Sequence, residues 1–136
     1  MTFVVGYDES PGAKLALDAA IDLASRYGEP LILVYGAAPP GGVGEEFQSH
    51  LAALEEMGRA ATSHALEKAL AAGVDAEVAV VHERPAPALL AVAERYDARM
   101  IIVGSYGESP LRGFILGSTT YKVLNQTDRP VLVVKG

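Results

Sequence analysis

Two glycine-bearing segments in the last third of the chain carry the residue types that hold a phosphate group. The first is Gly104-Ser105-Tyr106-Gly107, and nine residues separate it from Gly117-Ser118-Thr119. Glycine lets the backbone approach an anion, because no Cβ stands in the way and positive φ is allowed. A helix beginning after Gly117 would add free N–H groups, a partial positive charge and two hydroxyls, from Ser118 and Thr119. We therefore expect a phosphate cradle here, and the expected ligand is a nucleotide.

The surrounding sequence places this cradle between a strand and a helix. Met100-Ile101-Ile102-Val103 is an apolar run typical of a buried strand, and Thr119 to Asn125 is predicted to be helical. A strand, a glycine loop and a helix start, in that order, favour binding over simple turn formation. The pattern is not a Walker P-loop, because it lacks Gly-Lys-Ser/Thr. It is not a dinucleotide fingerprint either, because Gly-x-Gly-x-x-Gly is missing after the first strand.

The rest of the chain reads as four more strands and three more helices. Short runs rich in Val, Ile and Leu predict strands at 3–8, 31–35, 76–81 and 131–134. Apolar spacing predicts one helix capped by Ser10 and ended by Gly28, a long one from about 45 to 72, and one that begins at Pro85. Alternating strands and helices predict an α/β domain whose parallel sheet is covered on both faces. Such sheets bind ligands beyond the carboxyl ends of the strands, where strand order reverses.

Length and composition favour one soluble domain spanning 1–136. Half of the 136 residues are hydrophobic, no apolar run approaches the ~20 residues of a membrane helix, and no signal-peptide pattern opens the sequence. The absence of cysteine excludes disulfides, thiolate catalysis and cysteine-based zinc sites. A net charge of −6 argues against a general nucleic-acid binder, although 99–136 hold five basic side chains against two acidic ones. We expect a cytoplasmic protein with neither nucleic acid nor membrane as a partner.

Few other side chains are placed to do chemistry. Asp8, at the end of the first strand, could bind ribose hydroxyls or a Mg²⁺ ion, or it could cap the following turn; we favour the ligand role, because this point opens on the expected crevice. Arg112 could reach a terminal phosphate or be a solvated loop residue. His50 and His64 lie about 21 Å apart on one predicted helix and cannot share a metal. The serines lack a histidine–acid partner, so nucleophilic hydrolysis lacks its components.

These residues resemble the universal stress protein family. The ATP-binding signature of that family is Gly-x-x-Gly, nine residues, then Gly-Ser/Thr, which fits 104–118 here. The resemblance covers essentially the whole chain. Further segments that resemble the family are Gly6-Tyr7-Asp8-Glu9-Ser10, Pro85 to Leu90, Ile101 to Ser105, Ile115 to Ser118 and Arg129 to Lys135.

The resemblance implies a single Rossmann-like, doubly wound domain of the adenine nucleotide alpha hydrolase-like kind, with strand order 3-2-1-4-5. It implies ATP or another adenine nucleotide in the crevice, with Asp8 near the adenosine and Gly36 facing the adenine. Asp8 would also be the contact for any Mg²⁺. The full set of residues expected to bind the nucleotide is Asp8, Gly36, Val103, Gly104, Ser105, Gly107, Arg112, Gly117, Ser118 and Thr119.

The resemblance implies a regulatory stress-response protein that binds ATP. Little or no hydrolysis is expected, because no general base and no arginine finger can be identified. Two positions depart from the family pattern: Tyr106 stands where histidine is common, and Glu108 where arginine or lysine is common. The alternative is a dimeric interaction module of the same fold in which these two residues disable the phosphate site. An enzyme acting on adenylated substrates is a third hypothesis, resting on fold analogy alone.

The last predicted strand is expected to pair with a second chain. Family members commonly form dimers through this strand. Here the four apolar residues Val131, Leu132, Val133 and Val134 would otherwise form an exposed sheet edge. A homodimer is therefore expected, and the alternative is that Pro130 and the short length protect the edge.

Overall fold

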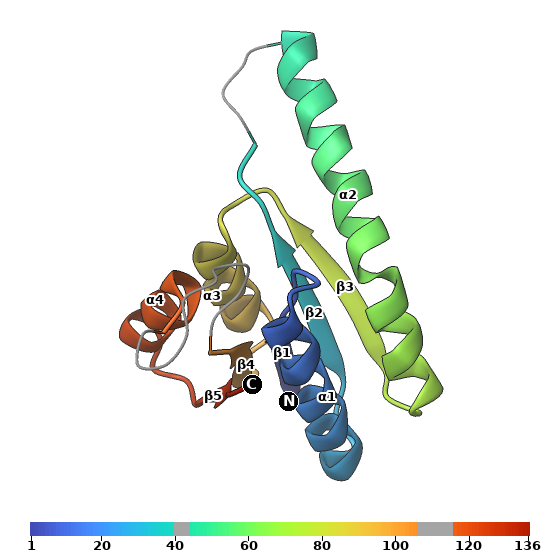
Figure 1. Ribbon diagram of the computed structural model, residues 1–136, viewed down its shortest axis with the longest axis vertical. Helices are drawn as coiled ribbons and strands as arrows, with labels where there is room; N and C mark the ends of the chain where they lie inside the picture. The colour runs from blue at the N-terminus through green and yellow to red at the C-terminus, as the bar shows by residue number, and fades with distance from the viewer. Residues whose placement is uncertain (40–43, 106–115) are drawn as a thin grey trace.

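The computed structural model describes residues 1–39, 44–105 and 116–136. Strands alternate with helices along these residues, as the sequence predicts (Figure 1). The elements are β1 (Thr2–Gly6), α1 (Pro11–Tyr27), β2 (Leu31–Gly36), α2 (Gly44–Ala71), β3 (Ala76–Val81), α3 (Pro85–Arg95), β4 (Ala98–Gly104), α4 (Ser118–Gln126) and β5 (Val131–Val134). No helix in this part of the chain is long and apolar enough to cross a membrane.

The five strands form one parallel sheet in the order β3-β2-β1-β4-β5, which confirms the predicted order 3-2-1-4-5. From β1 the chain builds outward to β2 and β3, and then returns past β1 to build β4 and β5 on the other side. The strand order therefore reverses between β1 and β4. The chain leaves β1 and β4 in opposite directions, so the connections that follow these two strands diverge and leave a crevice at the carboxyl ends of the strands.

Helices cover both faces of the sheet, and side-chain alternation along each strand feeds two hydrophobic cores. In β1, Phe3 and Val5 point to the face covered by α1 and α2, and Val4 points to the face covered by α3 and α4. All three side chains are fully buried. Strands buried on both faces need apolar residues at every position, which is why the strand segments read as continuous apolar runs.

Local signals fix the ends of α1 as predicted. The Ser10 hydroxyl accepts a hydrogen bond from the N–H of Ala13 at 3.2 Å, Pro11 occupies the first helical position, and Gly28 ends the helix in the left-handed conformation at φ 64°. The start of β4 was less readable from the sequence. It begins at Ala98 rather than Met100, because Ala98 pairs with Thr2 across a register shift in β1.

Helix α2 buries side chains against the sheet in its C-terminal half. Its buried residues are Gly58, Thr62, Ala65 and Ala69. At Gly58 the helix lies so close to the sheet that a Cβ would stand 2.8 Å from the Val80 side chain. The N-terminal half, 44–57, holds no fully buried residue, because it runs past the end of the sheet (Figure 1).

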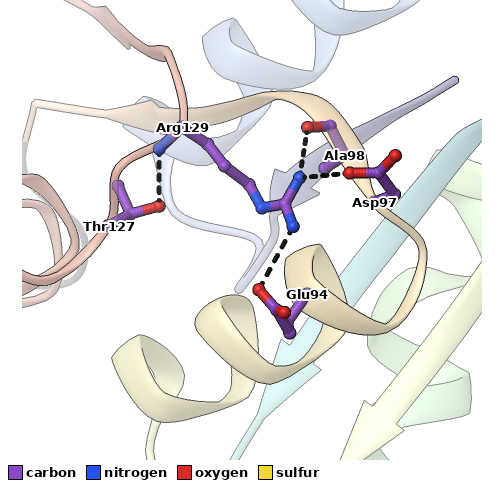
Figure 2. A network of polar contacts seen from close by, with 5 residues as sticks. All are labelled: Glu94, Asp97, Ala98, Thr127 and Arg129. Atoms are coloured by element: carbon purple, nitrogen blue, oxygen red, sulfur yellow. Dashed lines mark hydrogen bonds and ion pairs between the residues drawn. The ribbon is translucent and has the colours of Figure 1, made fainter.

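Arg129 ties the segment before β5 to the turn before β4 (Figure 2). Its Nη1 donates to Asp97 Oδ1 at 2.9 Å and to the Ala98 carbonyl at 3.0 Å, and its Nη2 donates to Glu94 Oε2 at 3.2 Å. The backbone N–H of Arg129 donates to Thr127 Oγ1, just beyond the end of α4. These contacts fix the C-terminal end of α4, and thereby the helix whose other end reaches the crevice.

Candidate functional site

A cavity of about 390 Å³ opens at the carboxyl ends of β1, β2 and β4, where the strand order reverses. Its size falls within the ~300–1,000 Å³ range of small-molecule sites. Three helix N-termini also reach it, those of α1, α3 and α4. The lining residues are Gly6, Tyr7, Asp8, Ser10, Ala13, Val34, Gly36, Pro85, Leu89, Val103, Gly104, Gly117, Ser118, Thr119 and Thr120.

On the α1 side, the cavity is lined by the side chain of Asp8, which the buried Ser10 holds in place. Asp8 Oδ1 accepts hydrogen bonds from the backbone N–H of Ser10 at 3.0 Å and from the Ser10 hydroxyl at 2.5 Å. Ser10 is 2% exposed. Asp8 Oδ1 therefore caps the turn after β1, which was one of the two roles expected for this residue. Asp8 also lines the cavity. This helix N-terminus is already occupied, because Ser10 caps it and a carboxylate stands beside it.

On the α4 side, the helix N-terminus is open. The N-cap residue is Gly117, which has no side chain to bond the first N–H groups, and no side-chain cap is present. Ser118 and Thr119 line the cavity, and the first-turn N–H groups of α4 have no side-chain capping partner in the described chain. Uncapped N–H groups and the positive end of the helix dipole together make an anion site.

Two hydrogen bonds lock this open N-terminus onto the end of β4. The buried Thr120 hydroxyl donates to the Gly104 carbonyl at 2.6 Å, and the Gly117 N–H donates to the Ser105 carbonyl at 2.7 Å. Ser105 in turn donates its N–H to the Val134 carbonyl in β5. The donors of α4 are thus pre-positioned at the crevice rather than free to move with the helix end.

The floor of the cavity is apolar. Val34, Val103 and Leu89 contribute side chains, from β2, β4 and α3. Gly36 lies between the sheet and the start of α3, where a Cβ would stand 2.8 Å from Ala88 Cβ and 3.0 Å from Pro85 Cα. A flat apolar group such as a base could stack here, with polar groups at both ends of the cavity.

Most of the predicted binding residues come together in this cavity. Asp8, Gly36, Val103, Gly104, Gly117, Ser118 and Thr119 all line it. Ser105 does not line it and acts through its backbone, as described above. Gly107 and Arg112 lie outside the described residues, as do the two departures from the family pattern, Tyr106 and Glu108.

Sequence reasoning missed two polar residues of the site. Thr120 was not singled out, although its buried hydroxyl fixes α4 to β4. Ser10 was read only as a helix cap. The spacing Asp8-x-Ser10 is that of an Asx turn, and this signal could have linked the two side chains. Nothing in the sequence marks Leu89 or Pro85 as cavity residues, because their position depends on how α3 packs.

The residues on either side of Asp8 are both unusual. Burial raises the pKa of the Tyr7 phenol above its usual value, and the charges of Glu9 and Asp8 add to this effect. Glu9 itself has a φ of 65°, in the left-handed region that non-glycine residues rarely adopt. The described chain brings together no three His, Cys, Asp or Glu side chains that could hold a metal. A Mg²⁺ ion at Asp8 would therefore depend on oxygens from the nucleotide and water.

Comparison with known proteins gives one consistent result. Residues 1–135 match the model of the universal stress protein family. A universal stress protein of Mycolicibacterium smegmatis is 33% identical over 137 residues, which is 97% of this chain and 45% of the relative. One from Thermus aquaticus is 31% identical over 135 residues and is covered over 98% of both chains. The chain thus spans about half the length of the mycobacterial relatives it matches and nearly all of the Thermus relative.

A solved structure gives the same result at the level of the fold. A universal stress protein in complex with cAMP is 28% identical, with a TM-score of 0.76, over 98% of this chain and 96% of that chain. The match thus covers nearly the whole of both chains.

Proposed function

Because this chain belongs to the universal stress protein family, we propose that it binds an adenine nucleotide in the cavity at the carboxyl ends of β1, β2 and β4. The ligand is ATP or another adenine nucleotide, and binding serves regulation in a stress response rather than catalysis. One observation carries the proposal: the N-terminus of α4 is uncapped and opens into the cavity at the point of strand reversal.

The two ends of the cavity have opposite polarity, which orients the nucleotide. The N–H groups of α4 are donors and suit the phosphate, and the Asp8 carboxylate is an acceptor and suits the ribose hydroxyls. The apolar floor between them suits the adenine. The 28% identical structure in complex with cAMP supports an adenine nucleotide as the ligand class.

Regulation is proposed over hydrolysis because the lining residues offer no general base beside a nucleophile. Asp8 is the only acidic or basic residue (Asp, Glu, Lys, Arg or His) among the described lining residues, and one of its oxygens is committed to Ser10. Phosphoryl transfer also needs groups that neutralise charge on the transferred phosphate, and the described wall supplies helix N–H groups alone. At most, slow ATP hydrolysis is expected.

The direct test is to identify what the protein holds. The purified protein is denatured, and the released small molecules are analysed by mass spectrometry; an adenine nucleotide is expected. Calorimetry with ATP, AMP and cAMP, each with and without Mg²⁺, then ranks the ligands. The variant Gly117→Val, which places a side chain at the phosphate position, should abolish binding. A protein that is recovered empty and ignores all three nucleotides would refute the proposal.

A second candidate is a dimeric interaction module that does not use the cavity. It is supported by the lack of a cationic side chain on the described cavity wall and by the open edge of β5. The discriminating variant is Glu108→Arg. If nucleotide affinity rises from undetectable to measurable, the native site is vestigial and the module hypothesis is favoured; if the wild type already binds, the module hypothesis fails.

The dimer itself is a separate proposal that both functions share. Within the described residues, β5 is an edge strand paired with β4 alone, and its four residues are partly buried. A second copy of this chain adding its own β5 would satisfy the free backbone groups and cover these side chains.

A further inference from the structure

We infer that Ser10 is a positioning residue that sets ligand specificity: it fixes Asp8 so that one carboxylate oxygen is left to read the ribose hydroxyls of the nucleotide. This inference rests on the proposed function and deepens it. It concerns which chemical feature of the nucleotide the α1 side of the cavity selects, a question that the open N-terminus of α4 does not address.

Ser10 is placed to hold Asp8 and little else. Ser10 is 2% exposed, and its hydroxyl donates its single proton to Asp8 Oδ1 at 2.5 Å and accepts from the N–H of Ala13. Because a hydroxyl has one proton, that proton cannot serve a ligand while it is given to Asp8. Ser10 therefore acts on a ligand through Asp8.

The consequence for Asp8 is that its two oxygens differ. Oδ1 already accepts two hydrogen bonds, one from the Ser10 hydroxyl and one from the Ser10 N–H. No donor reaches Oδ2 within the described residues, so this oxygen has its lone pairs available. A carboxylate clamped through one oxygen has a fixed plane, and the other oxygen becomes a single, pre-oriented acceptor.

A pre-oriented acceptor selects for donors. The part of a nucleotide that is rich in O–H donors is the ribose, whose two vicinal hydroxyls can both donate to one carboxylate. The oxygens of a phosphate would instead be repelled by the carboxylate. Loss of a hydrogen bond to a charged acceptor costs more than loss of a neutral one. The cavity should therefore prefer a ribonucleotide over the same nucleotide without its hydroxyls, and this preference should depend on Ser10.

The strained conformation of Glu9 is consistent with this arrangement. Glu9 separates Asp8 from Ser10 and adopts φ 65°, which brings the Ser10 N–H and hydroxyl back onto the same carboxylate oxygen. Strain of this kind persists when the surrounding structure demands a particular geometry. Here the geometry it produces is the clamp on Asp8.

The test compares AMP with 2′,3′-dideoxy-AMP by calorimetry in the full chain. The wild type should bind AMP at least fivefold more tightly. In Ser10→Gly, which keeps an acceptable helix start but has no hydroxyl, this ratio should fall to below twofold. Ser10→Asn should recover part of the preference, because asparagine caps helices and its amide can donate to Asp8. The control is Ser63→Gly, at an exposed serine of α2 far from the cavity, and it should keep the wild-type ratio.

A double-mutant cycle separates positioning from mere stability. In an Asp8→Ala background the ratio should be near one, and adding Ser10→Gly should change neither ligand's affinity further. If Ser10→Gly weakens both ligands equally and leaves the ratio intact, or if its effect adds fully to that of Asp8→Ala, Ser10 is only a helix cap and the inference is wrong. Should the glycine variant not fold, Ser10→Asp applies the same test, since aspartate caps the helix but has no proton to give Asp8.

The two proposals fail differently. A wild type that binds AMP with no preference over the dideoxy form overturns the role of Ser10 and leaves nucleotide binding standing. A wild type that binds neither compound overturns both.

Discussion

The backbone of Gly12, in the first turn of α1, touches Gly104 at the end of β4: a Cβ on Gly104 would stand 2.8 Å from the carbonyl carbon and oxygen of Gly12. Real Cβ atoms do not come this close to backbone, so position 104 is closed to any side chain. The contact sets where α1 begins relative to β4, and with it the distance between Asp8 on one wall of the cavity and the start of α4 on the other. Gly104 is thus explained by helix–strand packing at the site, in addition to any approach of phosphate.

Gly104→Ala should therefore destabilise the protein. The new methyl group meets backbone that cannot rotate away, and overpacking of this kind costs about 1–3 kcal/mol of unfolding free energy. Gly6→Ala is the matched control at the end of the neighbouring strand, where the closest atom, at 3.0 Å, is the far end of the flexible Leu89 side chain. Urea unfolding of both variants measures the difference. Equal stabilities for the two would show that α1 can move away from β4 at little cost.

The relation between Gly12 and Gly104 also shows where sequence reasoning stops. Apolar runs bounded by glycine and proline predicted the strands 76–81 and 131–134 with the bounds that the structure has, because such runs depend on local composition. The glycine at 104 was read as a ligand contact because the sequence alone cannot show that a helix turn 92 residues earlier lies against it.

The same limit applies to α2 and to the site. The apolar spacing of α2 runs along its whole length and predicted the helix, but the sequence does not show that its buried residues begin only at Gly58. In the site, Gly104, Gly117, Ser118 and Thr119 of the predicted motif line the cavity, and they could be singled out because their order along the chain is itself the signal. Thr120 and Leu89 were not found, because only tertiary packing brings them to the cavity.

Ser118→Glu should change stability and nucleotide binding in opposite directions. The first turn of α4 has no acidic residue, and a carboxylate there would interact favourably with the helix dipole, adding about 0.3–1 kcal/mol of stability. The same carboxylate would take the place proposed for the phosphate and repel it, lowering affinity more than tenfold. Ser118→Gln introduces a side chain of the same size without charge, so both its gain in stability and its loss of nucleotide affinity should be smaller. Thermal unfolding measures the change in stability, and calorimetry measures the change in nucleotide affinity. Unchanged affinity in Ser118→Glu would mean that the phosphate does not bind at the N-terminus of α4.

Glu9→Gly should stabilise the protein. Glu9 adopts φ 65°, a conformation that costs an L-residue roughly 1–2 kcal/mol. Glycine avoids this cost, but part of the resulting stabilisation is lost because glycine has greater conformational freedom in the unfolded chain. The expected net gain is about 0.5–1 kcal/mol. Glu9→Ala keeps the Cβ and hence the strain, so it should stay near the wild type in urea unfolding. A destabilised glycine variant would mean that the Glu9 side chain makes a favourable interaction that outweighs the strain.

The ion pair at the amino end of the sheet predicts a loss of stability in acid. Arg99 donates to both oxygens of Glu29, at 2.7 and 2.6 Å, and these hydrogen bonds hold the pKa of Glu29 below its usual value. Because the folded-state pKa is the lower one, the stabilisation is complete above pH ~4.5 and is lost as the pH falls through the lowered pKa. Unfolding measured from pH 7 to 3 should show this decline in the wild type.

Arg99→Gln tests the origin of that decline. The variant should be less stable than the wild type at pH 7, and the two curves should converge in acid, where Glu29 is protonated in both. The matched control is Arg26→Gln, which breaks an ion pair with Asp22 whose side chains are both mostly exposed, and its curve should stay close to that of the wild type. Parallel curves for Arg99→Gln and the wild type would assign the acid sensitivity to other carboxylates.

Val133→Pro should dissociate the proposed homodimer without unfolding the protein. The carbonyl of Pro130, just before β5, accepts from Ile101 in β4, and that of Val134 accepts from Ser105, just after β4. The backbone groups of the alternate residues, Val131 and Val133, therefore face the open edge. Proline at 133 removes one outward N–H and leaves the ladder with β4 intact, which is where edge strands tolerate proline. Val134→Pro is the contrasting variant, because it alters a residue bonded to β4 and should destabilise the fold. Sedimentation equilibrium should show a wild-type dimer and a monomeric, folded Val133→Pro; a variant that stays dimeric would place the interface on another surface.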